Sequence, residues 1–154
     1  MRGERRDWCR TVLVTLVVGA VASGCAGSSR SDEDYRHKAA NTAEAAASAV
    51  STARLAVEAA GRGRLTGPYA SVLLGEAETD LLAAQATFES RQPPGEAADT
   101  VRERLGTLLD DAADALAEVR IGARRGEVRE LAEHTGQLRQ AAERLEGFEE
   151  EMSS

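Results

Sequence analysis

The chain has 154 residues, enough for one domain, and it contains 29 alanines but only five aromatic residues. A core this rich in Ala suits closely packed helices and argues against a β-sandwich or barrel. The formal net charge is −7, and residues 25–154 carry −9 because residues 1–24 hold four Arg and two acidic residues. An acidic surface repels nucleic-acid phosphates, so nucleic acid is not an expected partner.

The N-terminal segment has the pattern of an export signal. Four arginines within residues 1–10 precede an apolar run at residues 11–22. This run has the length of the apolar part of a signal peptide, whereas a membrane-spanning helix needs about 20 residues. Small residues follow in Ala22-Ser23-Gly24-Cys25. This boundary resembles the lipobox of bacterial lipoproteins, a resemblance confined to residues 1–25.

The resemblance implies that Cys25 is the lipidated N-terminus of an exported protein. Diacylglyceryl transfer to its sulfur would precede cleavage between Gly24 and Cys25, so residues 1–24 would be removed. Two acyl chains would hold the protein on the extracytoplasmic face of the cell membrane. Residues 25–31 would form the lipidated, flexible tether. The pair Arg5-Arg6 also resembles a twin-arginine export motif, which leaves the general and twin-arginine export routes both open.

Four segments, near residues 32–60, 68–90, 96–121 and 127–151, repeat apolar residues three and four positions apart, which predicts amphipathic helices. The expected core stripe of the first segment is Ala39, Ala43, Ala46, Val50, Ala53, Val57 and Ala60, and that of the second is Ala70, Leu74, Ala77, Leu81, Ala84 and Phe88. The stripe of the third segment is Ala98, Val101, Leu105, Leu108, Ala112, Ala115 and Val119. The stripe of the fourth is Val128, Leu131, Thr135, Leu138, Ala142, Leu145 and Met152, with Phe148 nearby.

Turn and capping residues separate these segments. Ser31 is placed to cap the first helix, and Pro68 suits an early position of the second. Residues 93–95, Pro-Pro-Gly, separate the second and third. Gly122 and Gly126 bracket the last break, and a single kinked helix is the alternative there.

Short connections make neighbouring helices antiparallel. We therefore expect an all-α, up-down-up-down four-helix bundle over residues 32–154, after a cleaved signal peptide and a short flexible tether. The heptad spacing also suits self-association.

No residue pattern predicts catalysis, a cofactor or a metal site. His37 and His134 would lie roughly 20 Å apart, too far to share one ion. Asp110, Asp111 and Asp114 fit a solvated helix face and have no partner that would make them an acid–base pair. The sequence therefore predicts a protein that is not an enzyme.

The expected topology separates charge along the bundle. The connections between helices one and two and between helices three and four would share the end far from the membrane. That end would carry an anion-binding tip of Arg62, Arg64, Arg124 and Arg125, with Arg120 and Arg129 near it. The membrane end would carry Asp32, Glu33, Asp34, Glu89, Glu96, Glu146, Glu149, Glu150 and Glu151, together with an aromatic plug of Phe88, Phe148 and Tyr35.

Arginine pairs well with phosphate and carboxylate groups. The expected function is thus that of a membrane-anchored extracytoplasmic lipoprotein, a non-enzymatic binding or structural protein of the cell envelope. Its partner would be an anionic cell-wall polymer or an acidic protein. The alternative is a small-molecule or metal-binding receptor whose site lies between the helices.

Overall fold

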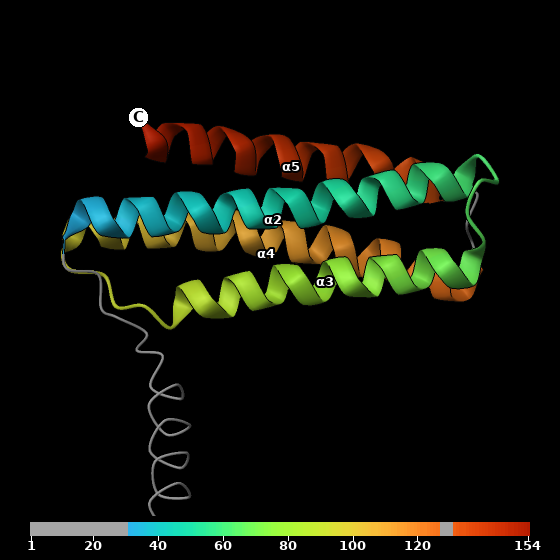
Figure 1. Cartoon of the computed structure of the whole chain (residues 1–154), viewed down its shortest axis with the longest axis horizontal. Helices are drawn as coiled ribbons and strands as arrows, with labels where there is room; N and C mark the ends of the chain where they lie inside the picture. Colours follow the sequence, from blue (N-terminus) through green and yellow to red (C-terminus); the bar gives the residue numbers. More distant parts are fainter. Residues whose placement is uncertain (1–30, 127–130) are drawn as a thin grey trace, which may run out of the picture.

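A computed structural model describes residues 31–126 and 131–154, which form four antiparallel α-helices (Figure 1). The helices are α2 (Asp32–Gly61), α3 (Gly67–Glu89), α4 (Glu96–Arg125) and α5 (Leu131–Ser153). Their arrangement confirms the predicted all-α, up-down-up-down bundle. The expected signal peptide, the Gly24–Cys25 cleavage site and the tether through residue 30 lie outside the described residues. No described helix combines the length and hydrophobicity needed to span a membrane.

The start of α2 follows the predicted capping chemistry. The backbone N–H of Asp34 donates to Ser31 Oγ at 3.1 Å, which satisfies one of the donors that a helix start leaves unpaired. The acidic residues of the first turn are also favourable there, because the helix dipole is positive at its N-terminus. Pro68 lies in the first turn of α3, as predicted.

The prediction that Gly122 ends the third helix is wrong. Helix α4 continues through it to Arg125, and the chain leaves the helix at Gly126, whose φ of 78° is left-handed. A glycine inside a helix costs about 1 kcal/mol relative to Ala. Here burial of Val119 and Ala123 on either side opposes that cost. Helices α4 and α5 are therefore separate antiparallel helices, and the kinked-helix alternative is excluded (Figure 1).

Helix α2 is the centre of the bundle. It packs against α3, α4 and α5, whereas within the described residues no Cα atom of α3 lies within 8 Å of a Cα atom of α5. Every residue of its predicted stripe is buried, and most of them are alanines. Because an alanine side chain is one methyl group, neighbouring backbones approach α2 closely and it contacts α4 across the diagonal. The large buried side chains come mainly from the other helices, which carry Leu74, Leu81, Leu105, Leu109, Leu116, Leu138 and Leu145.

The core stripe of α4 differs from the prediction at two positions. Leu109 and Leu116 are fully buried, while the predicted Leu108 and Ala115 are half-buried. Leu108 and Ala115 instead border grooves on the outer side of the α4–α5 pair. The predicted stripes also included Ala84 and Thr135, which are half-buried. Val128 and the Leu131 side chain lie outside the described part.

Candidate functional site

The turn between α2 and α3 and the end of α4 lie at the same end of the bundle (Figure 1). We call this the distal end, and the end where α2 begins the proximal end. The four tip arginines, Arg62, Arg64, Arg124 and Arg125, were predicted to lie at the distal end. The helix topology brings them to that end as expected, while Arg129 lies outside the described residues.

A specific backbone motif fixes the first two tip arginines. Gly63 has a φ of 69°, its N–H donates to Ala60 O at 2.9 Å, and the Arg64 N–H donates to Ala59 O at 2.8 Å. This pair of bonds is a Schellman motif, which satisfies carbonyl groups that the end of α2 would otherwise leave unpaired. The motif holds Arg62 and Arg64 immediately beyond the last turn of α2.

The other two tip arginines occupy the last turn of α4, directly before Gly126. Cations are favoured at a helix C-terminus because the carbonyl groups there carry partial negative charge. Helix-end stabilisation therefore accounts for part of the presence of Arg124 and Arg125. It does not account for Arg64, which lies in the turn after α2.

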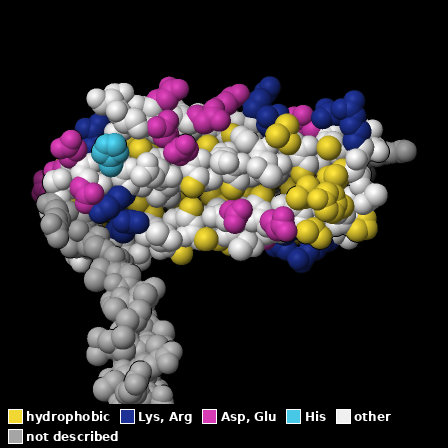
Figure 2. All heavy atoms as spheres, viewed as in Figure 1, with side chains coloured by type: hydrophobic (Ala, Val, Ile, Leu, Met, Phe, Trp, Pro, Cys, Tyr) yellow, Lys and Arg dark blue, Asp and Glu magenta, His cyan; other side chains and the backbone are white. Residues whose placement is uncertain are grey.

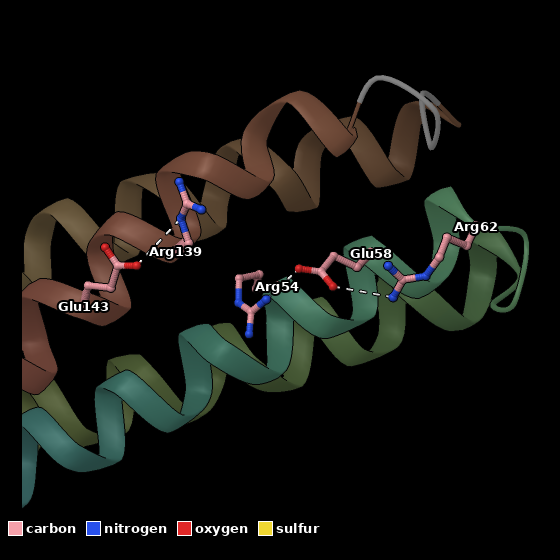
Figure 3. A network of polar contacts seen from close by, with 5 residues as sticks. All are labelled: Arg54, Glu58, Arg62, Arg139 and Glu143. Atoms are coloured by element: carbon pink, nitrogen blue, oxygen red, sulfur yellow. Dashed lines mark hydrogen bonds and ion pairs between the residues drawn. The ribbon is translucent and has the colours of Figure 1, made fainter.

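Salt bridges divide the distal arginines into paired and unpaired ones. Glu58 forms ion pairs with Arg54, at 2.6 Å, and with Arg62, at 3.5 Å (Figure 3). Arg120 Nε lies 2.7 Å from Glu78 Oε2, with both side chains only 21% exposed. Because that pair ties α4 to α3, Arg120 has a structural role. Arg64 is exposed and forms no ion pair with another residue in the described part.

Arg124 and Arg125 are likewise exposed, and neither pairs with a described carboxylate. Among the residues whose side chains the structure describes, 31–126 and 134–154, four arginines form neither an ion pair nor a side-chain hydrogen bond: Arg64, Arg91, Arg124 and Arg125. Three of these four belong to the tip, so the tip is the main concentration of uncompensated positive charge on the described surface.

The proximal end is less acidic than its carboxylates alone suggested. Arg104 forms a bidentate pair with Glu151, at 2.6 and 2.8 Å, and this pairing lowers the pKa of the Glu151 carboxyl. Lys38 pairs with Asp34 at 2.6 Å. Arg36 also donates to the Glu151 carbonyl oxygen. The predicted acidic residues are present, but basic side chains partly neutralise their charge.

The two histidines are separated, as predicted. His37 is exposed near the start of α2, at the proximal end. His134 lies near the start of α5, where its Nδ1 is 3.1 Å from Gln137 Oε1 and 3.8 Å from Glu118 Oε2. No group of three or more His, Cys, Asp or Glu side chains in the described part could hold a metal ion.

The acidic cluster of α4 is engaged in contacts between helices. Gln85 Nε2 on α3 donates to Asp110 Oδ1 at 2.8 Å, and Arg144 on α5 pairs with Asp111 at 2.7 Å. Asp114 borders a groove that faces α5. Asp110 therefore contacts α3, whereas Asp111 and Asp114 border the same groove toward α5, where Arg144 pairs with Asp111.

Three aromatic side chains fill the proximal end, as predicted. Tyr35 and Phe88 are buried with ring centroids 5.3 Å apart and planes tilted by 48°. Phe148 is also buried, with the Arg104 guanidinium 5.3 Å from its ring centroid. Phe88 and Phe148 border separate grooves. The three rings therefore belong to the buried core, and Phe88 and Phe148 face different grooves of the described part.

An apolar surface that was not predicted from the sequence lies beside the tip. Tyr69 and Val72, in the first two turns of α3, are 55% and 53% exposed. Figure 2 shows a hydrophobic cluster over this part of α3, with basic side chains above and below it. The signal was present in the sequence, because both residues fall outside the predicted core stripe of residues 68–90.

Comparison with known protein families, curated proteins and solved structures gave no match. The features that bear on function are therefore the geometry of the bundle and the sequence of the N-terminal segment.

Proposed function

We propose that this protein is a membrane-anchored extracytoplasmic lipoprotein whose helical bundle presents an arginine-rich tip to an anionic partner in the cell envelope. The role is one of binding or spacing, not of catalysis. The single observation that carries the proposal is the position of the arginines that have no carboxylate partner among the described residues. Arg64, Arg124 and Arg125 gather at one end of the bundle, whereas Arg104, Arg120 and Arg144 have carboxylate partners.

The geometry of attachment supports this proposal. A lipid on Cys25 would join the membrane to the start of α2 through residues 26–31. Helix α2 has 30 residues, and at 1.5 Å per residue it is about 45 Å long. The tip arginines would then lie about 45 Å beyond the tether. An anchored rod of this length would expose its tip to the envelope layer next to the membrane.

The filled aromatic end gives no support to the receptor alternative. A receptor with its site between the helices would need an open cavity near Tyr35, Phe88 and Phe148, and these three side chains are buried in the packed core. An anionic wall polymer or an acidic protein surface suits the tip better, because arginine makes bidentate contacts with phosphate and carboxylate groups.

Retention on purified cell wall tests the proposal. The full chain and a variant with all four tip arginines replaced by Ser would be compared on wall that retains its anionic polymers and on wall stripped of them. Exposed ion pairs contribute about 0.5 kcal/mol each, so the variant should bind about thirtyfold more weakly. Retention of the unchanged protein should also fall as salt rises, because exposed charges are screened.

A charge-matched control separates the tip from net charge. Replacing Arg36, Arg54, Arg139 and Arg144 by Ser removes the same four positive charges outside the tip, and this variant should bind like the unchanged protein. Equal retention of the tip variant, or equal loss by both variants, would refute a specific role for the tip. The lipid anchor is tested separately by mass spectrometry of the native protein: an unmodified Cys25, or a retained Met1, would contradict it.

A further inference from the structure

The exposed apolar surface beside the tip arginines indicates the chemical class of the partner. We infer that the first turns of α3 are a docking site for a protein segment that carries both acidic and apolar side chains, and not for a purely anionic polymer. This inference rests on the proposed function of the tip and narrows its partner. The docking surface, which we call the apolar patch, consists of Pro68, Tyr69, Val72 and Leu73.

Helical spacing makes these residues one continuous surface. Residues three and four positions apart are neighbours on a helix, so Tyr69 lies beside both Val72 and Leu73, and Pro68 lies beside Val72. Pro68, Tyr69 and Val72 are exposed and Leu73 is half-buried. Within the bundle, α3 buries a different face, which carries Ala70, Leu74, Ala77 and Leu81.

The positions of Tyr69 and Val72 set them apart from scattered exposed apolar residues. Five large hydrophobic side chains are strongly exposed in the described part, and these two share one turn of one helix. Isolated apolar residues are common on protein surfaces, whereas a contiguous group marks an interaction site. Packing within the described part of the bundle gives no reason for a half-exposed tyrosine at position 69.

The tip arginines border this patch on two sides. Arg64 lies three residues before the first residue of α3. On α4, the contacts of Asp110 with Gln85 and of Arg120 with Glu78 fix the antiparallel register of the two helices. Continuing that register toward the distal end brings Val72 level with the last turn of α4, which carries Arg124 and Arg125.

An apolar centre with a charged rim is the usual composition of a protein–protein interface, and Tyr and Arg are enriched among its energetic centres. A phosphate- or carboxylate-bearing polymer would pair with the arginines but leave Val72 and Leu73 in water. A protein segment with alternating acidic and apolar residues would satisfy both. Glu76, exposed one turn beyond Val72, makes the far border acidic, so the partner's carboxylates should face the tip.

Three labelled peptides of equal negative charge can separate these possibilities. The first is an amphipathic helix of Glu and Leu, the second has the same composition with its pattern scrambled, and the third is polyglutamate. Binding of each to the full chain in detergent micelles is measured by fluorescence anisotropy at low and high salt. The patterned peptide should bind at least about tenfold more tightly than the other two, as expected when an apolar anchor adds to charge.

Two variants of α3 locate the binding site. The double substitution Tyr69→Ser and Val72→Ser should weaken binding of the patterned peptide about tenfold and leave the binding of polyglutamate unchanged. The matched control is Ala83→Ser with Ala86→Ser, which alters two exposed residues at the other end of the same helix and should change nothing. Far-ultraviolet circular dichroism confirms that all the variants keep the bundle.

The outcomes distinguish this inference from the proposed function. Equal binding of patterned and scrambled peptides, unaffected by the changes at Tyr69 and Val72, would overturn the apolar patch while leaving the anion-binding tip intact. Binding that depends on Tyr69 and Val72 but ignores salt and the four tip substitutions would overturn the anionic partner. Binding of none of the three peptides would overturn the inference, and the cell-wall assay would still decide the proposed function.

Discussion

Replacing Tyr35 by Phe should stabilise the bundle, although it removes a polar group from the protein. Tyr35 is fully buried, and its hydroxyl has no hydrogen-bond partner among the described residues. A buried polar group without a partner costs about 1–3 kcal/mol. Phe keeps the ring and its contact with Phe88, so the substitution should remove that cost without opening a cavity. We expect the free energy of unfolding to rise by about 1 kcal/mol.

The effect is large enough to measure by thermal or urea unfolding followed by circular dichroism at 222 nm. For a domain of this size, 1 kcal/mol corresponds to about 4 °C in Tm. The control is Tyr69→Phe, which removes a hydroxyl that is already exposed and should change Tm by less than about 2 °C. A loss of stability on Tyr35→Phe would refute the reasoning, because it would mean that the hydroxyl makes a favourable contact.

The pH dependence supplies a second measurement at the same residue. Burial raises the pKa of the Tyr35 hydroxyl above its ordinary value of 10.0, and the positive charge of Arg102 opposes this rise only in part. A raised pKa means that the folded state holds the proton more tightly than the unfolded chain. The free energy of unfolding is therefore unaffected by this titration below about pH 10, and it falls as the pH rises further because the unfolded chain loses the Tyr35 proton first. The advantage of Tyr35→Phe should grow above pH 10.

The remaining predictions concern core packing and two glycines. Leu109→Ala should lower the free energy of unfolding by about 2–5 kcal/mol because the side chain is fully buried. Leu108→Ala should lower it by less than about 1.5 kcal/mol because removal of the half-exposed Leu108 side chain leaves little cavity. Equal losses in urea unfolding would contradict the observed rotation of α4. Gly63→Ala should lose about 1 kcal/mol, since its φ of 69° is unfavourable for any residue with a Cβ. Gly75→Ala, in a helical position with open space around the added methyl group, should gain about 0.5–1 kcal/mol. Similar shifts in Tm for the two glycine variants would disprove this distinction.

The sequence alone predicted the four helices because their signals are local. Ser31 and Pro68 mark helix starts through chemistry that involves only the nearest residues. The apolar spacing of α2 repeats so regularly that each stripe residue from Ala39 to Ala60 is buried. The assignment of Tyr35 and Phe88 to one end also needed only helix lengths and alternating direction.

Local signals failed where two outcomes have similar energies. Gly122 has the residue type of a helix break, yet burial of Val119 and Ala123 keeps α4 helical through it. Leu108 and Leu109 are adjacent leucines, and either could belong to an apolar stripe. Only the direction from which α2 approaches α4 decides that Leu109 is buried and that Leu108 borders a groove.

For the candidate site, the sequence determined which residues gather at the distal end, because helix count and direction fix the end at which each connection lies. Only the tertiary structure decided which of the charges there are compensated. Arg120 and Glu78 are 42 positions apart in the chain but 2.7 Å apart in space, and no local pattern encodes that meeting. The same packing buries one face of α3 and leaves Tyr69 and Val72 in solvent beside Arg64, which has no ion-pair partner among the described residues. Spacing along a chain specifies neighbours on one helix, whereas contacts between helices depend on how their axes rotate when the core packs.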